Sequence, residues 1–423
     1  MRFAAIILGL VASTASLLAQ TEAAPTTMPT KHAWIRMGGD PATKSTLEIA
    51  LRRFDRPDGI AVTLVGVAHV GEKSFYEALQ QKLNTFDVVL YESVLPDGAS
   101  RPEGSNDTER TEATTRSLKF LGDTARRFRE EAGAWPLTID ELGAWAKKLD
   151  PRVGHGVRNA STDAWGIAIT CAVDAATGEF TVQTTSRDGR PSLTFKVELP
   201  TSKPTDKKPK KAPSNVQRDL AHALGLSYQL DGIDYAGASF VHADATLGDV
   251  ERGMKAAGGN FERIDSLLRG SGPMGTVLQL MISLIKNSSD DTKGMMRGLL
   301  VELLASADDR MTDALGKGTS DVIVGMRNRV AFRELDRFLM QSRPPRTIAI
   351  FYGALHLDDM SARLEERGFR ASAADWLTAI TAEATPGGND NLRKQLLGGM
   401  KKAGEKRKAP TSRPDSKPAN EGR

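Results

Sequence analysis

Two apolar runs, far apart in the chain, end in the same way, and they constrain the fold more than any other feature of the sequence. "VTLVGVAHVG" at 62–71 and "IAIFYGALHL" at 348–357 each carry a histidine, His69 or His356, with a glycine three places before it. Short continuous apolar runs are typical of strands buried on both faces of a parallel sheet. Because the carboxyl ends of parallel strands meet at one edge of a sheet, we expect His69 and His356 to lie near each other.

The segments around these runs predict an α/β fold. "STLEIALRRF" and "IAVTLVGVAH" flank the turn "DRPDG" and predict a β-hairpin, which "EKSFYEALQQKLNTF" continues as a helix and "DVVLYESVL" as a second buried strand. A strand, helix and strand in this order favour a central, mostly parallel sheet with flanking helices. Further on, "TIAIFYGALH" is expected to be the last central strand, "LDDMSARLEERG" a helix and "FRASAADWLTAI" an edge strand.

Residues 109–200 differ in character and predict a small α+β insertion. Two helical segments are followed by short strands around the turns "ATGE" and "RDGRP". Three of the five tryptophans, Trp135, Trp145 and Trp165, lie in this stretch, so it is expected to have its own small core. A linker rich in lysine and proline, 201–215, follows the insertion.

The α/β core is therefore expected in two parts, 45–108 and 216–385. Its second part reads as mostly helical up to about residue 342, interrupted by "LDGIDYAGASFVHADAT". The segment "GTVLQLMISLI" at 275–285 is too short to span a membrane and is expected to be a buried helix.

The two ends of the chain predict export and a disordered tail. Arg2 precedes an apolar stretch that ends in small residues, which is the pattern of a secretory signal peptide over 1–19, with cleavage expected after Ala19. The mature protein is then expected to be secreted or periplasmic, with no transmembrane span. Residues 386–423 lose the hydrophobic pattern and are expected to be disordered.

Charge and cysteine content exclude several classes of function. Residues 401–423 hold eight Lys and Arg against three acids, and 201–213 hold five Lys against Asp206, so the rest of a chain whose net charge is +4 carries about −5. The folded body is thus mildly acidic, and we expect no nucleic-acid partner. Cys171 is the only cysteine, which excludes an internal disulfide framework.

A carboxylate is a third candidate site residue beside the two histidines. Glu92 follows the apolar positions of "DVVLYES", where a carboxylate is costly to bury unless it is paired or bound to a cation. Two histidines and a carboxylate form a ligand set that can hold a divalent metal of the manganese, cobalt or zinc class and leave a position open for water. Such a metal supports hydrolysis. Glu92 is alternatively a general base, with fewer protein ligands on the metal.

A purely structural interpretation stands beside the catalytic one. A histidine at a strand end is often a hydrogen-bonded structural residue, and one glycine three places before one histidine is a weak motif. Of the remaining histidines, His155 is expected in a loop and His222 on a helix. "FVHAD" makes His242 and Asp244 a possible supplementary polar pair, although an ordinary loop role is the favoured interpretation.

"GVAHVGEKSFYEAL", "DVVLYES", "GMRNRVAFRELDRFL" and "GALHLDDMSARLEERGF", in this order, resemble the TraB and TIKI family, which is related to erythromycin esterases and to the ChaN haem-binding proteins. The resemblance covers about 45–95 and 216–380. It implies a metal-dependent hydrolase site, which in TIKI proteins is a divalent-metal protease. Position by position it points to His69 and His356 as metal ligands, to Glu92 as ligand or base, and to Arg327 and Asn328 as catalytic residues.

Arg327 can also be judged from its surroundings in the sequence. It lies beside the apolar positions Val330 and Ala331 on a predicted helix, where a guanidinium should seek an acidic or anionic partner. An ordinary surface ion pair is the competing interpretation. Met326 stands where the family often has an acid, which departs from the family pattern.

The insertion resembles a different family. "WPLTIDELGAW", "DAWGIAI" and "GEFTVQTTSRDGRP" are similar to the soluble headpiece of the type II secretion major pseudopilin, although the processed pilin helix is lacking. This resemblance implies a possible calcium site in the loops, near Asp188, and a possible protein partner. Asp-Gly is also an ordinary turn signal.

Three functions remain open from the sequence. The first is an exported hydrolase that acts on a peptide, the target favoured by the TIKI resemblance, or on an ester. The second is a non-catalytic protein that binds haem or iron. The third is a scaffold that acts through its pilin-like insertion.

Overall fold

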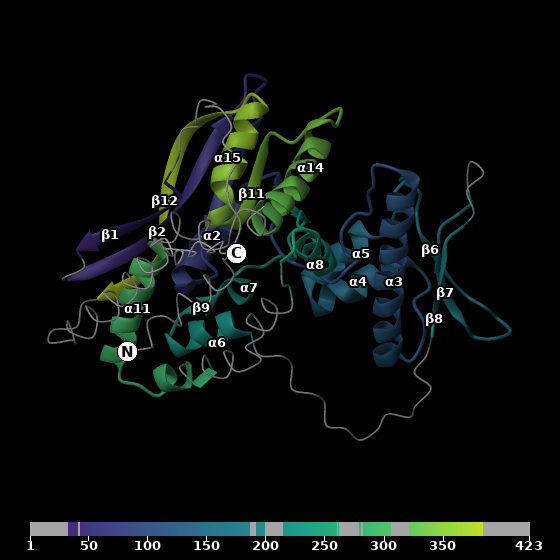
Figure 1. Cartoon of the computed structure of the whole chain (residues 1–423), viewed down its shortest axis with the longest axis horizontal. Coiled ribbons are helices and arrows are strands. Elements are labelled where there is room, and N and C mark those ends of the chain that lie inside the picture. The colour runs from purple at the N-terminus through teal and green to yellow at the C-terminus, as the bar shows by residue number, and fades with distance from the viewer. Residues whose placement is uncertain are drawn as a thin grey trace, which may run out of the picture.

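The computed structural model describes residues 33–40, 43–186, 192–198, 215–259, 261, 279–280, 282–305 and 321–383. Its main sheet is mixed and seven-stranded, with the strand order β1-β2-β3-β11-β5-β10 and β12 paired with β2. Figure 1 labels β1, β2, β11 and β12 of this sheet. The strands are β1 (Ile35–Asp40), β2 (Lys44–Asp55), β3 (Ala61–Val67), β5 (Val88–Tyr91), β10 (Phe240–His242), β11 (Thr347–Gly353) and β12 (Arg370–Glu383).

The strands β3, β11 and β5 form the predicted parallel core of the sheet, and β10, which was not predicted, pairs parallel with β5. β11 lies between β3 and β5, with Gly353 opposite Val67 and Ile348 opposite Val88. β1, β2, β3 and β12 pair antiparallel, so the sheet as a whole is mixed rather than mostly parallel. The predicted hairpin of β2 and β3 and the predicted edge strand, β12, are both confirmed.

Helices cover both faces of the sheet because alternate side chains of the buried strands point to opposite sides. On one face Ala349 and Phe351 pack against α2 (Lys73–Leu83), α6 (Val216–Ala223) and α11 (Asp290–Ala305). On the other face Ile348 and Ile350 pack against α14 (Arg327–Leu339) and α15 (Leu357–Glu366). The result is the predicted α/β architecture with flanking helices.

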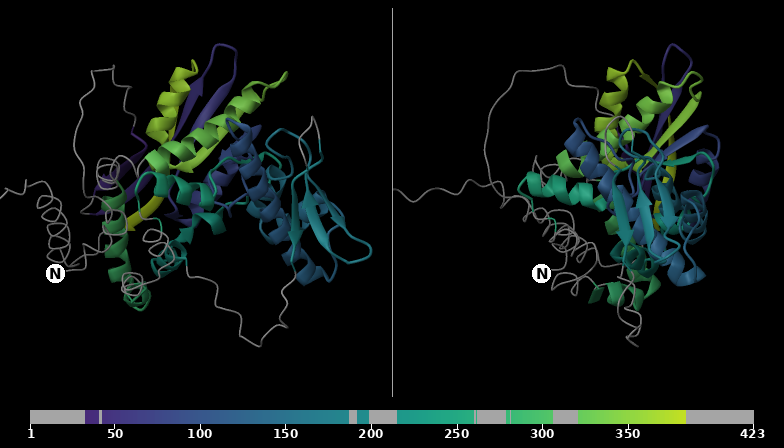
Figure 2. Two further views of the ribbon diagram at one scale, coloured as in Figure 1. Left: turned by 45° about the vertical axis from the view of Figure 1, so that its right-hand side comes forward. Right: turned by 90° about the vertical axis from the view of Figure 1, so that its right-hand side faces the viewer.

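The stretch between β5 and α6 forms an α+β module with its own hydrophobic cluster. It contains α3 (Asp107–Ala132), α4 (Ile139–Leu149), α5 (Pro151–Asn159) and an antiparallel sheet of β6 (Thr170–Val173), β7 (Phe180–Gln183) and β8 (Thr194–Val197). The small sheet packs on α3 and lies away from the central sheet (Figure 2). Trp135 stacks on Phe180 with ring centroids 4.6 Å apart, as expected of a separate small core.

Three predictions about single segments are wrong. His155 lies on helix α5 rather than in a loop, and His242 ends strand β10. The described part of 275–285 is helical but not buried all round, because Leu280 and Leu284 are exposed while Ile282 and Ile285 pack inward.

Other predictions fall outside the described residues. They concern the signal peptide at 1–19, the linker up to residue 214, the tail at 386–423 and Asp188. In the part of the chain that is described, no helix has both the length and the apolar character that crossing a membrane requires.

Candidate functional site

The structure brings His69, Glu92 and His356 together at the carboxyl edge of the parallel strands. Glu92 directly follows β5, His69 lies two residues after β3, and His356 ends the 3₁₀ turn Ala354–His356 that follows β11. The three side chains converge on Gly353. A Cβ atom placed there would lie 3.3 Å from Glu92 Oε2, 3.6 Å from His69 Nε2 and 3.9 Å from His356 Cδ2.

Arg327 is the cation at the centre of the site, and its anionic partner is Asp244 as well as Glu92. Its Nε and Nη2 donate to the two oxygens of Asp244 at 2.9 and 2.7 Å, and Nη2 also donates to Glu92 Oε1 at 2.5 Å. Arg327 begins α14 directly after the π-helical turn Asp321–Met326. All three side chains are buried, so the expected anionic partner is present and the interpretation as a surface ion pair is wrong.

The charges of this cluster stabilise one another. Burial raises the pKa of Glu92, but the charge of Arg327, with smaller contributions from His356 and His69 and from the N–H of Gly353, which donates to Oε2 at 2.6 Å, outweighs it, and the pKa falls well below its usual value. Burial likewise lowers the pKa of Arg327, and the carboxylates of Asp244 and Glu92 more than compensate. The arginine and Glu92 are therefore both charged at neutral pH.

The two histidines are held in the same way by side-chain amides. Nδ1 of His69 lies 2.6 Å from Oε1 of Gln229, and Nδ1 of His356 lies 2.6 Å from Oδ1 of Asn328. An amide oxygen only accepts hydrogen bonds, so each Nδ1 carries a proton and Nε2 is the ring nitrogen left to face the site. The Nε2 atom of each ring, which could ligate a metal ion, therefore lies on the side of Glu92 and Gly353.

The two imidazoles differ in exposure. His356 is buried, and its burial is the largest cause that lowers its pKa to about 4, so the ring is neutral at neutral pH. Arg327 Nη1 lies 3.4 Å from Nε2 of His356. His69 is exposed at the rim. The site therefore has a fixed, neutral imidazole inside and an accessible one outside.

The donor set fits a divalent ion in its chemistry, but the arrangement is not a closed metal site. In the described part of the chain, no group of three or more His, Cys, Asp and Glu side chains is placed to hold a metal ion. Both oxygens of Glu92 already accept hydrogen bonds, although an ionised carboxylate has further lone pairs. An ion shared by His69, Glu92 and His356 requires these side chains to close further.

Asn328, Asp244 and Gln229 complete the site. Asn328 was named from the family pattern, and its amide also donates to the carbonyl of His356 at 3.0 Å and to Asp359 at 2.7 Å. Asp244 is not an ordinary loop residue, because its buried carboxylate holds Arg327. Sequence reasoning missed Gln229, which begins the short helix α7 (Gln229–Gly232), and no signal in the sequence marks it.

A second polar cluster connects the module to the strand that carries Glu92. Tyr91 Oη lies 2.8 Å from Nδ1 of His155 on α5. The neighbouring His242 contacts two groups. Its Nδ1 lies 3.3 Å from the amide nitrogen of Asn159, and its Nε2 lies 2.6 Å from the carbonyl oxygen of Ser93. Nε2 of His155 is buried and has no hydrogen-bond partner in the described structure. Burial, assisted by the charges of Arg158 and His242, lowers the pKa of His155 to about 4.

This cluster predicts a loss of stability in mild acid. An unfolded histidine takes up a proton near pH 6.5, whereas folded His155 does so only near pH 4, so the free energy of unfolding falls as the pH is lowered through this window. Urea unfolding at pH 7 and 4.5 is expected to show that His155→Asn reduces the fall by on the order of 1–3 kcal/mol. His222→Asn, on the exposed side of α6, serves as the control. Equal pH slopes for wild type and His155→Asn would contradict the assignment.

No protein-family model matches this sequence, and comparisons with curated proteins and with solved structures find no match either. Fold and site together define a mixed α/β protein with a buried cluster of one arginine, two carboxylates and two amide-held histidines.

Proposed function

We propose that this chain is an exported, metal-dependent hydrolase of the TraB and TIKI type, with His69, His356 and Glu92 as the residues that hold a divalent ion. The observation that carries the proposal is the matched amide contact on Nδ1 of both histidines. Metal-binding histidines commonly have the other ring nitrogen fixed by a hydrogen bond of this kind. A bound ion of the manganese, cobalt or zinc class would supply a water of lowered pKa and polarise a substrate carbonyl.

The residues of the chain have separable roles in this proposal. Asn328 and Gln229 fix the ring orientation of His356 and His69. Arg327 keeps its positive charge beside the ligands and is suited to stabilise a developing oxyanion or to bind a substrate carboxylate. Asp244 holds Arg327 in that position.

The role of Glu92 is better described as ligand than as general base. A general base works best when its pKa lies near the working pH. The pKa of Glu92 is held well below its usual value by Arg327, the histidines and the N–H of Gly353, so this carboxylate is a weak base. A peptide bond remains the favoured target, and an ester fits the same chemistry.

The proposal is tested by metal analysis and hydrolysis assays on purified protein. The wild type is expected to bind one divalent ion and to hydrolyse peptide or ester reporters, while His69→Ala and His356→Ala are expected to lose at least about a hundredfold in metal affinity and turnover. His222→Ala, at an exposed histidine of α6 that is not among the proposed ligands, is the control. Haem uptake without turnover would show that the protein is a carrier and not a hydrolase. If the protein binds no metal and has no turnover, the scaffold function is favoured.

The module is the part of the proposal that concerns a partner. Its likeness to a pseudopilin headpiece rests on the sequence blocks around Trp135 and Trp165, and its α+β content and separate core are compatible with it. A protein partner that binds the module would lie on the side of the molecule away from the central sheet (Figure 2).

A further inference from the structure

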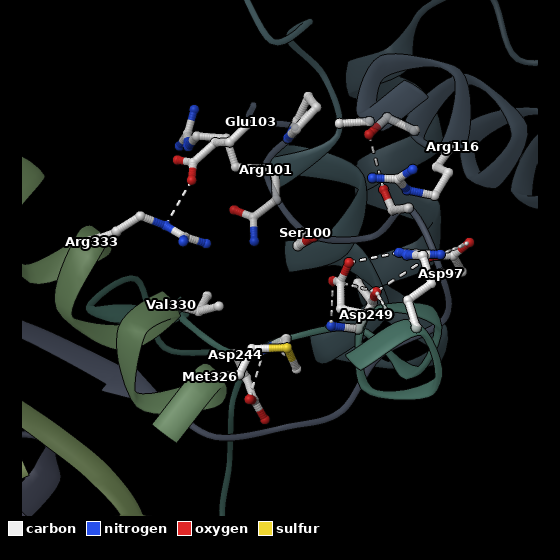
Figure 3. Close-up of a pocket in the computed structure, with 18 of the residues that line it drawn as sticks. Asp97, Ser100, Arg101, Glu103, Arg116, Asp244, Asp249, Met326, Val330 and Arg333 are labelled. Carbon is white, nitrogen blue, oxygen red and sulfur yellow. Dashed lines mark hydrogen bonds and ion pairs between the residues drawn. The ribbon is translucent and has the colours of Figure 1, made fainter. Parts of the chain in front are cut away.

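A cavity of about 470 Å³ lies where the module meets the core, beside the site but apart from its imidazoles (Figure 3). Its walls come from the loop 97–103, from α3, from α8 (Leu247–Ala256) and from α14. Asp244 and Met326 line the cavity, whereas His69, Glu92 and His356 do not. Its volume lies within the range of small-molecule sites.

The walls of the cavity are tightly built. Gly98 has a φ of +82°, and a Cβ there would lie 2.1 Å from the carbonyl oxygen of Arg116, so only glycine lets the loop pack this closely on α3. On the opposite wall Thr246 and Asp249 form a capping box at the start of α8. Arg252 donates to Asp97 at 3.0 Å and to Asp249 at 2.7 Å and so ties the loop to α8.

Every acidic side chain that lines the cavity already has an arginine. Asp97 and Asp249 are bound by Arg252, and Asp244 by Arg327. Glu103 pairs with Arg333 at 2.7 Å, and Glu334 pairs with Arg337 and Arg101. The charge of each of these acids is therefore balanced by an arginine.

Arg116 also lines the cavity, and none of these acids is its partner. In the described part of the structure it makes no hydrogen bond or ion pair, and its guanidinium points into the cavity (Figure 3). Arg333 lies on the facing wall and is paired with Glu103. An anion in the cavity would give the guanidinium of Arg116 the charged partner that it lacks.

We propose that this cavity binds a small organic anion through a carboxylate or phosphate group. Arg116 supplies the fork of N–H donors, Arg333, which also pairs with Glu103, a second guanidinium on the facing wall, and the Ser100 hydroxyl a further donor at the rim. Val330 and Met326 provide an apolar wall for the rest of the molecule. The inference does not depend on hydrolysis, because none of the proposed metal ligands lines the cavity.

Calorimetric titration of the full chain, pretreated with EDTA so that anions cannot ligate a metal, tests the inference. The probes are inorganic phosphate, succinate and acetyl-Ala-Ala with a free carboxylate, with acetyl-Ala-Ala amide as the neutral counterpart. At least one anionic probe is expected to bind saturably at one site, and the amide is not. Binding of phosphate alone would indicate a phosphorylated ligand, and binding of the carboxylates alone a carboxylic acid.

Variants of α3 assign the binding to Arg116. Arg116→Gln is expected to weaken binding by at least about tenfold, whereas Arg116→Lys keeps the charge and retains part of it. Arg127→Gln, an exposed arginine of the same helix, should bind like the wild type. The inference is overturned if no anion binds, if Arg116→Gln binds like the wild type, or if Arg127→Gln weakens binding equally. Hydrolysis is assayed on protein that has not been treated with EDTA, so this assay tests the proposed function independently of anion binding.

Discussion

Arg327→Met is expected to lower the free energy of unfolding by about 3–5 kcal/mol, because it removes the cation between two buried carboxylates. Glu92 Oε1 and Asp244 Oδ2 both accept a hydrogen bond from the same Nη2 atom. Methionine has a similar length but no charge, so the two acids would face each other unpaired in a buried site. Urea unfolding monitored by circular dichroism measures the loss.

The pH dependence of this loss identifies its cause. The pKa of Glu92 is depressed in the folded wild type, so the stability that it contributes is fully present above its unfolded pKa and is lost as the pH falls below that value. In Arg327→Met the facing carboxylates instead bind protons more readily than in the unfolded chain. The difference in stability between variant and wild type should therefore shrink as the pH is lowered from 7 to 5.

Arg329→Met is the matched control for this experiment. Arg329 lies two residues further along α14, is exposed and pairs with Asp321 at 3.5 Å. An exposed pair of this kind contributes about 0–1 kcal/mol, so this variant should unfold almost like the wild type. Equal losses for both arginines, or a loss at position 327 that grows toward pH 5, would refute the charge cluster as the source.

Gly353→Ala is expected to abolish the proposed hydrolysis, by about a hundredfold or more, while the protein stays folded. The residue has a φ of −54° and a ψ of 139°, which alanine adopts without strain. The added methyl group would lie 3.3 Å from Glu92 Oε2 and 3.6 Å from His69 Nε2, at the point where the proposed ligands converge. A displacement of about 1 Å at such a site is enough for a loss of this size.

The other glycine of the repeated motif supplies the comparison. A Cβ at Gly66 would lie 2.7 Å from Cγ2 of Ile49 and 3.0 Å from the carbonyl oxygen of Ala50, within the core of the sheet. Gly66→Ala should therefore cost about 1–3 kcal/mol of stability. Thermal unfolding and turnover are measured for both variants. A stable and fully active Gly353→Ala protein would show that this point is not part of the reaction site.

The α/β architecture could be predicted because its central strands are continuous apolar runs. β3, β5 and β11 are such runs, α2 has a helical period, and turn residues separate the elements. β10 was missed because its three residues pair only at the edge of the sheet and give no period. The extent of parallel pairing was overestimated because β12, which adds an antiparallel partner along the whole of β2, reads as a single edge strand.

Glycines misled the prediction for His155. "VGHGV" reads as a loop, yet these residues lie within α5, which begins at Pro151 and is capped by the side chain of Asp150. A Cβ at Gly154 would lie 2.8 Å from the Cα atom of Lys147 on α4. The glycine therefore reports close packing of two helices, which local sequence cannot reveal.

The site was predictable where a residue follows a buried strand and unpredictable where it arrives from elsewhere. His69, Glu92 and His356 stand at strand ends, which topology brings to one edge. Asp244 follows the unrecognised β10, so its burial could not be foreseen. Gln229 contacts His69 across 160 residues, through its side-chain oxygen and its backbone N–H, and such contacts leave no trace in a local pattern.

The position of β11 between β3 and β5 has a consequence for biosynthesis. A ribosome finishes β3 and β5 long before it reaches residues 347–353, and until then the two strands lack the neighbour that joins them. Such pairing over a long sequence separation is slow, and open strand edges invite association between nascent chains. The module that follows β5 in the chain has a core of its own and can fold before β11 is synthesised. Chains truncated before residue 347 should therefore aggregate, and a chain of this topology should need a holding chaperone until its last central strand emerges.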